Sequence, residues 1–375
     1  MRHQDARAIP SAPLGWRMSG GWMSSTPRAG AFLLMLMVST GWGCSRKPAP
    51  EAADVWTAEG GLRCEGLQHL ACTGLYGDAG EGWATKTVPE SVRPFTPGLQ
   101  LWSDGLEKSR FISLPPGTRV DTTRMDEWRF PPGTRLWKEF RWKGRRIETR
   151  FLWKRPDGTW LRTTYRWSDD ERTALELTDG EQHVPGTNDY EIPRQADCQA
   201  CHNGRGDGVL GFEAVALAHP EARGLTLARL VQEKLLTQAP ATLPSIPGTP
   251  VEAEALGYLH MNCGVSCHNA NTPALGSTSG LHLRLEVAEL GSVAATDTAN
   301  TAVGVKSLFQ TSGLFGGASF RVAPGDVKHS TLLHRMAQRG NAVQMPPLAT
   351  HVLDERGLAL IQRWIEAMPP VRGDR

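Results

Sequence analysis

The sequence predicts a multidomain α+β protein in which an antiparallel β-rich domain precedes a mainly α-helical domain. Residues 98–193 contain short runs of alternating apolar and polar residues, separated by turn-forming residues. Residues 249–370 begin with a helix-capping sequence and end with an amphipathic helical pattern. A connector over residues 194–248 joins the two domains, and a tether with a loop-rich lead-in over residues 45–97 precedes them.

Residues 1–44 have the pattern of an export signal. Arg28 precedes an apolar run from Ala31 to Val38, which is too short to span a bilayer, and small residues follow it. The segment before this run is long for a signal, and translation from Met18 or Met23 would give a signal of ordinary length. We therefore expect the mature chain outside the cytoplasm, in the periplasm or outer envelope.

All seven cysteines can be assigned in such an oxidising compartment. Cys44 follows Gly43 at the end of the signal and resembles the lipidated cysteine of a lipoprotein, which would anchor the chain to a membrane. Plain cleavage nearby is the alternative. Cys64 and Cys72 are predicted to form a local disulfide, and the other four cysteines belong to two motifs. The net charge of +2, with acidic and basic residues nearly balanced, predicts no nucleic-acid partner.

The β-rich domain is predicted from its hairpins. Residues 148–154 and 160–167 are strand-like runs separated by Pro156-Asp157-Gly158, and Lys143-Gly144 separates residues 137–142 from the first run. These turns predict an antiparallel meander or sandwich. The many Trp and Arg residues could stack on a ligand, but we favour cross-strand packing as their role.

The most informative motif is Cys198-Gln199-Ala200-Cys201-His202. Two thiols at this spacing, with a histidine directly after the second, form the attachment signature of haem c. The thiols bond to the vinyl groups of the haem, and the imidazole binds its iron. A zinc site or a thiol-exchange pair is the alternative, but no second cysteine pair with finger spacing accompanies this motif.

The distal ligand of this first iron must come from elsewhere in the chain. His183 and His219 are the nearest flanking imidazoles and Met125 is a distant thioether, and of these we favour His219. The glycine-rich residues 203–208 follow the motif, and we expect them to let the backbone pass close to the porphyrin edge.

A second motif, Cys263-Gly264-Val265-Ser266-Cys267-His268, carries one extra residue between its thiols. Two predicted helices bracket it. Thr249-Pro250-Val251-Glu252 combines an N-cap, a proline at the first helical position and the glutamate of a capping box, and it opens a helix to about Met261. Asp354 caps the other helix, which has one apolar face formed by Leu358, Ile361, Trp364, Ile365 and Met368. The alternative to haem attachment is a Cys263–Cys267 disulfide, with His268 as a loop residue.

This arrangement resembles the class I cytochrome c family. In that family a haem motif follows an N-terminal helix, a Met-Pro-Pro type loop supplies the distal iron ligand, and a terminal helix carries a large aromatic residue. The resemblance implies that His268 and Met345, of Met345-Pro346-Pro347, are the axial pair. It also implies that Gly257 and Trp364 mark a close crossing of the two terminal helices.

A broader resemblance covers residues 96–364. The segments Leu101–Lys108 and Trp137–Phe140 are similar to those of a family of exported proteins, in which a β-rich region precedes a Cys-x-x-Cys-His motif and a cytochrome-like segment.

The sequence therefore predicts an exported c-type cytochrome that carries electrons between redox partner proteins through one or two covalently bound haem c groups. Thioether ligation opposite an imidazole raises the potential, so the site of His268 is expected to be the more oxidising. One alternative is a haem enzyme, such as a di-haem peroxidase or an oxidase subunit; another is a ligand-binding β domain with an accessory haem module. Electron transfer is favoured over catalysis, because the sequence gives no decisive sign of an open iron position. No nucleophile–base set, phosphate loop or paired-carboxylate motif stands out, which argues against hydrolytic or phosphoryl chemistry.

Overall fold

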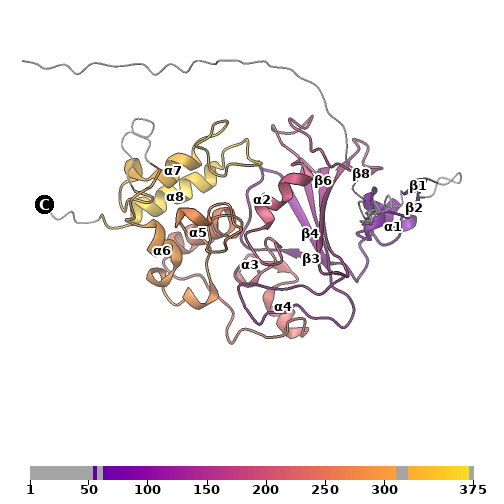
Figure 1. Cartoon of the computed structure of the whole chain (residues 1–375), viewed down its shortest axis with the longest axis horizontal. Coiled ribbons are helices and arrows are strands. Elements are labelled where there is room, and N and C mark those ends of the chain that lie inside the picture. Colours follow the sequence, from indigo (N-terminus) through magenta and orange to yellow (C-terminus); the bar gives the residue numbers. More distant parts are fainter. Residues whose placement is uncertain (1–53, 57–61, 310–319, 371–375) are drawn as a thin grey trace, which may run out of the picture. The chain divides into compact units, whose positions relative to one another are not determined.

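The computed structural model describes residues 54–56, 62–309 and 320–370 (Figure 1). The predicted signal and Cys44 lie outside the described residues. None of the described helices combines the length and apolar composition needed to span a membrane.

The described residues form a mixed α+β fold, as predicted, around a seven-stranded antiparallel sheet with the order β8-β7-β6-β5-β4-β3-β9. Its strands are β3 (Arg93–Thr96), β4 (Glu107–Ser113), β5 (Arg135–Trp142), β6 (Arg145–Lys154), β7 (Trp160–Trp167), β8 (Ala174–Glu176) and β9 (Arg223–Gly224). A separate pair consists of β1 (Val55–Trp56) and β2 (Leu62–Arg63).

Both predicted hairpins are confirmed. Lys143 and Gly144 have φ angles of 49° and 81° in the turn between β5 and β6, the left-handed pair that a tight hairpin turn requires. The sheet is wider than residues 98–193, because β3 lies before this range and β9 after it. The chain thus leaves the sheet at β8, passes through the first cysteine motif and returns to the opposite edge at β9.

The two faces of the sheet are buried against different segments. The residues 62–92 that precede β3 cover one face, where Trp83 stacks on Trp167 with the ring centroids 5.2 Å apart. The other face packs on residues that follow the sheet, including Phe212, together with the segment around Phe130. Trp137 and Trp167 are almost fully buried, which agrees with a packing role for the aromatic residues.

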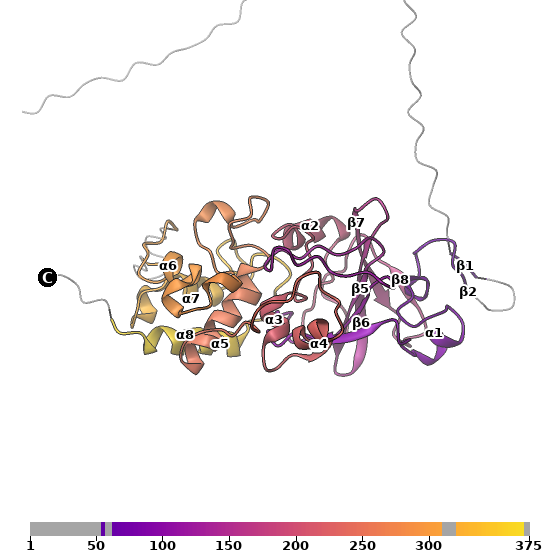
Figure 2. The ribbon, with the colours of Figure 1, turned by 90° about the horizontal axis from the view of Figure 1, so that it is seen from below.

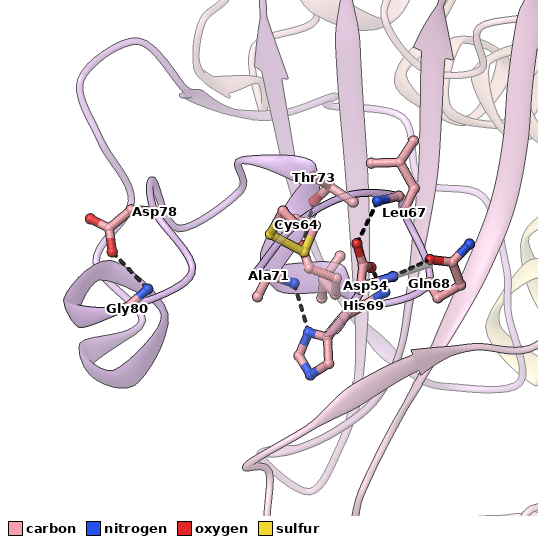
Figure 3. The surroundings of a disulfide bond; sticks show 12 residues. Asp54, Cys64, Leu67, Gln68, His69, Ala71, Thr73, Asp78 and Gly80 are labelled. Atoms are coloured by element: carbon pink, nitrogen blue, oxygen red, sulfur yellow. Dashed lines mark hydrogen bonds between the residues drawn. A yellow bond between two sulfur atoms is a disulfide. The ribbon is translucent and has the colours of Figure 1, made fainter. Parts of the chain in front are cut away.

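The predicted disulfide between Cys64 and Cys72 is present (Figure 3). Asp54 lies beside it, and its carboxylate accepts hydrogen bonds from the backbone of Gly66 at 2.7 Å and of His69 at 2.9 Å. The bridge and the carboxylate together hold the lead-in against the edge of the sheet, where the backbone of Glu176 in β8 donates to the carbonyl of Gln68 at 2.8 Å.

The helices lie mainly in the second half of the chain. They are α1 (Glu81–Thr85), α2 (Cys198–His202), α3 (Ala214–Ala218), α4 (Leu227–Gln232), α5 (Pro250–Leu259), α6 (Asp297–Ala302), α7 (Thr331–Met336) and α8 (Glu355–Ala367). The capping box of Thr249 and Glu252 is formed at the start of α5, and Asp354 accepts from the backbone of Gly357 at the start of α8. Both predicted helix starts are therefore confirmed.

Helices α5 and α8 pack side by side (Figure 2), and Trp364 of α8 is buried in the core to which both contribute. The prediction that Gly257 marks their close crossing is wrong, because a Cβ there would meet Leu99 and Ile246 rather than α8. The close approach is instead made at Gly357, where a Cβ would lie 2.3 Å from the Tyr258 hydroxyl. The glycine that lets the helices approach thus lies on α8, and it faces an aromatic residue of α5.

Candidate functional site

The two cysteine motifs lie at two adjoining cavities. One cavity, of about 440 Å³, is lined by both thiols of the second motif together with His268 and Met345. The other, of about 140 Å³, is lined by Cys201 and His202 of the first motif. Six residues line both cavities: Trp102, Asn262, Cys267, Leu275, Pro346 and Pro347.

The first motif forms the short helix α2, and its histidine is held by the turn that follows. His202 Nδ1 donates a hydrogen bond to the carbonyl oxygen of Gly208, which leaves Nε2 with its lone pair for a metal. Gly208 has a φ of 64°, and a Cβ there would lie 2.2 Å from the carbonyl oxygen of His202. Burial lowers the pKa of His202 to about 4, so the imidazole is neutral, as a ligand must be.

The second motif is built on a wider helical turn. After α5, residues His260–Gly264 form a π turn, and the backbone N–H of His268 donates to the carbonyl of Cys263 at 2.8 Å, five residues back. A π turn holds one more residue than an α turn, so it absorbs the extra spacer residue. Cys263, Cys267 and His268 consequently line the same cavity.

The surroundings of His268 also restrict its ring. A Cβ on Gly276 would lie 2.7 Å from His268 Nδ1, so this position must be glycine for the ring to occupy its place. Ser279 Oγ lies 3.4 Å from the same nitrogen. Burial lowers the pKa of His268 to about 4, and this imidazole is neutral as well.

All four motif thiols are free, so the alternative Cys263–Cys267 disulfide is not formed. Burial raises the pKa of Cys263 to about 12 and of Cys267 to about 11, and it also raises the pKa values of Cys198 and Cys201. Thiol-exchange cysteines need a lowered pKa, so these environments oppose that alternative.

The arrangement gives no support to a zinc site. Within the described part of the chain, the one group of three potential ligand atoms lying within 4.8 Å of one another comprises Asp54, Cys64 and Cys72. Both of its sulfurs are in the disulfide.

Met345 reaches the larger cavity from a loop that is held at several points. Its backbone N–H donates to the carbonyl of Arg335 at 3.0 Å, and Gln344 Nε2 donates to the carbonyl of Pro346 at 3.0 Å. The two residues that the resemblance pairs as axial ligands, His268 and Met345, are therefore brought to one cavity.

His219 is not brought to the first motif. It caps the end of α3, its ring lies where a Cβ on Gly98 would be, and its Nδ1 accepts from the backbone of Glu221 at 3.2 Å. The smaller cavity is lined by His202 but by neither His219, His183 nor Met125. The prediction of a distal ligand from this set gains no support from the geometry.

The turn after the first motif touches the second motif. A Cβ on Gly204 would lie 2.1 Å from the carbonyl oxygen of Ser266. The two motifs can therefore contact each other only because residue 204 is a glycine. Asn271 Nδ2 donates to the carbonyl of Gly204 at 2.8 Å and to Glu127 at 3.0 Å. Glu127 in turn forms an ion pair with Arg284, which follows the second motif.

Sequence analysis missed the basic residues that line the smaller cavity: Arg110, Lys138 and Arg150. Each lies on a different strand of the sheet, and the alternation of side chains along β4, β5 and β6 is the signal that could have placed them on one face.

No protein-family model, curated protein or solved structure matches this chain. What the cavities can bind is therefore judged from their own residues.

Proposed function

We propose that this protein is an exported c-type cytochrome that transfers electrons between redox partner proteins. The observation that carries the proposal is the meeting of two thiols, a neutral imidazole and a thioether at one cavity of about 440 Å³. Two thiols and an imidazole match the attachment of haem c, a thioether is a common second ligand of its iron, and the porphyrin needs an apolar enclosure. The walls include Leu281, Leu283 and Met336, which supply apolar surface.

Each residue has a definite part in this proposal. Cys263 and Cys267 would attach the vinyl groups, and His268 and Met345 would hold the iron. Cys198, Cys201 and His202 would attach a second haem. Bound haem would supply reversible one-electron chemistry at its iron. The chain keeps the imidazoles neutral and, in the case of His202, fixes the tautomer through Gly208.

The larger cavity also has basic residues to receive negative charge. Arg321, Arg335 and Arg339 line it, and the hydrogen bonds described for their guanidinium groups go to backbone carbonyls. Such groups can pair with the propionate carboxylates of a porphyrin. We further propose that the segment from α5 to α8 is the class I cytochrome c-like domain, and that the signal-like residues 1–44 direct export and lipid anchoring through Cys44.

A second candidate is a haem enzyme, and one observation favours it. Within the described part of the chain, the lining of the smaller cavity offers no methionine and no imidazole besides His202. A haem held there could keep an open iron position for a small ligand. High-spin absorption bands in the purified protein would support this candidate, whereas fully low-spin spectra would favour electron transfer alone.

The test is the number of haems per chain, measured by intact mass and pyridine haemochrome on protein exported by a host with a haem-ligation system. We expect two haems in the wild type and one in each of the variants Cys198→Ser/Cys201→Ser and Cys263→Ser/Cys267→Ser. The matched control, Cys64→Ser/Cys72→Ser, removes two cysteines far from the cavities and should keep both haems. Colourless wild-type protein from this host would refute the proposal.

A further inference from the structure

A row of three basic residues crosses the sheet at the smaller cavity. Arg110 on β4 lies directly opposite Lys138 on β5, and Lys138 lies directly opposite Arg150 on β6. All three line the cavity of Cys201 and His202. Like charges placed directly opposite one another destabilise a sheet, so this row needs a compensating negative charge.

Within the described residues, a carboxylate neutralises the positive charge of only one member of this row. Arg150 is paired with Glu148, at 2.7 Å, and Tyr190 also donates to this carboxylate. Glu148 is fully buried. Its single negative charge is therefore matched by Arg150, and no ion pair is found in the part of the chain that the structure describes for Arg110 or Lys138.

Arg110 is the more deeply buried of these two. It is 5% exposed, its Nη2 donates to Gln100 at 3.0 Å, and its Nη1 has no hydrogen-bond partner. A buried guanidinium N–H without a partner costs free energy, and a ligand in the cavity could supply the missing acceptor.

The ammonium group of Lys138 is the second basic group of the row, next to Arg110. Within the described residues, no hydrogen bond or ion pair is found for Lys138 Nζ, which lies 4.9 Å from the centre of the Phe140 ring. Burial, and then the charges of Arg110, Lys108 and Arg150, lower the pKa of Lys138 well below its usual value. An anion in the cavity would reverse this effect by favouring the charged ammonium.

We propose that Arg110 and Lys138 form an anion site in the cavity of Cys201 and His202, which binds a carboxylate or a small oxyanion. The guanidinium fork and the ammonium donate hydrogen bonds and accept none, so together they favour an anion as their partner. The anion has two sources: the propionate of a haem attached at this cavity, which rests on the proposed function, or a free oxyanion from solution.

The experiment measures the binding of inorganic phosphate by titration calorimetry. It uses the haem-loaded mature chain and its Cys198→Ser/Cys201→Ser variant, each with and without Lys138→Gln. Lys143→Gln is the matched control, because Lys143 lies in the exposed turn at the end of the same strand. Arg110→Gln provides a second test of the site.

A propionate source predicts that phosphate binds to the Cys198→Ser/Cys201→Ser variant and not to the loaded wild type. A free oxyanion predicts binding to both. In either case Lys138→Gln and Arg110→Gln should weaken binding at least tenfold, and Lys143→Gln should leave it unchanged. Phosphate binding that is absent from both forms, or that does not respond to either substitution, would overturn the anion site.

Infrared difference spectra give a second measurement if the Cys198→Ser/Cys201→Ser variant does not fold. A shift of the carboxylate bands of the loaded protein on Lys138→Gln supports a propionate source, and unchanged bands together with no phosphate binding overturn the site. The haem count separates the two proposals. If the protein carries no haem but still binds phosphate through Lys138, the anion site stands and the cytochrome proposal is refuted. If it carries two haems and shows no effect of Lys138 on anions, the cytochrome proposal stands and the anion site is refuted.

Discussion

At the scale of single residues, Met345 gives the most direct test of the haem that we propose for the larger cavity. We expect Met345→Ala in the haem-loaded protein to abolish the weak sulfur-to-iron absorption band at the red end of the spectrum. It should also lower the midpoint potential of that site by on the order of 0.1 V, because a thioether stabilises ferrous iron.

The control for this substitution is Met336→Leu. Met336 lines the same cavity, and leucine keeps its apolar volume, so the band and the potential should stay as in the wild type. If Met345→Ala leaves both the spectrum and the potential unchanged, Met345 is not the ligand.

Glu127 is a second single residue with a measurable effect, here on acid stability. Burial alone would raise the pKa of Glu127, but the positive charge of Arg284 and hydrogen bonds from Gly206 and Asn271 outweigh it and hold the pKa at about 2. A carboxylate whose pKa is lower in the folded protein than in the unfolded chain stabilises the fold at pH values above the unfolded pKa. This contribution is lost as the pH falls through the pKa of the folded state. Wild-type stability should therefore decline between about pH 5 and pH 2.

Glu127→Gln should remove this part of the decline. The variant should be less stable than the wild type by roughly 2 kcal/mol at neutral pH, because Arg284 is left buried without its carboxylate. Chemical denaturation at several pH values measures this, and the difference should shrink towards pH 2. Glu107→Gln, at an exposed position, is the control and should follow the wild type. A constant difference at all pH values would contradict the assignment.

At the scale of elements, the contact between α5 and α8 depends on Gly357. A Cβ at this position would lie 2.3 to 2.5 Å from three atoms of the Tyr258 phenol group. Overpacking costs roughly 1–3 kcal/mol, and the ~1 kcal/mol that alanine gains over glycine in a helix offsets part of this cost. We expect Gly357→Ala to lower the free energy of unfolding by up to about 2 kcal/mol in denaturant titrations. Gly291→Ala meets no atom within 4 Å and should change little.

Elements with local signals could be predicted, and those formed by distant segments could not. The capping box at Thr249 and the turn at Lys143-Gly144 are each determined by residues that are close in sequence. Strand β9 has two residues, too few for a periodic pattern, and it exists because β3 offers it an edge. In the same way, the wider turn that absorbs the spacer before Cys267 becomes visible only in the backbone hydrogen bonds of the folded chain.

The same distinction between local and distant signals applies to the residues of the candidate site. The two motifs could be located from the sequence because the order of thiols and histidine is local, and both lie at the cavities. The choice of His219 relied on nearness in sequence, but the short helix α3 leads its ring towards Gly98. The basic row was missed because Arg110, Lys138 and Arg150 meet only through strand register.

At the scale of the whole molecule, the two cavities adjoin, because they share lining residues and the motifs touch at Gly204. Charged groups bound in the two cavities would interact electrostatically, because the protein interior screens charge poorly. Gly204→Ala should push the motifs apart, because its Cβ would lie 2.1 Å from the Ser266 carbonyl oxygen. We expect a loss of roughly 1–3 kcal/mol in stability and a shift in the midpoint potentials of both haems in spectroelectrochemical titrations.

Gly206→Ala lies in the same turn and serves as its control. A Cβ there would meet Glu127 at an ordinary contact distance of 3.5 Å, so neither stability nor the potentials should change. The decisive feature is that one small substitution should alter both centres together, because both motifs contact each other at Gly204. A shift confined to the centre of His202 would instead mean that the two cavities work independently despite their shared walls.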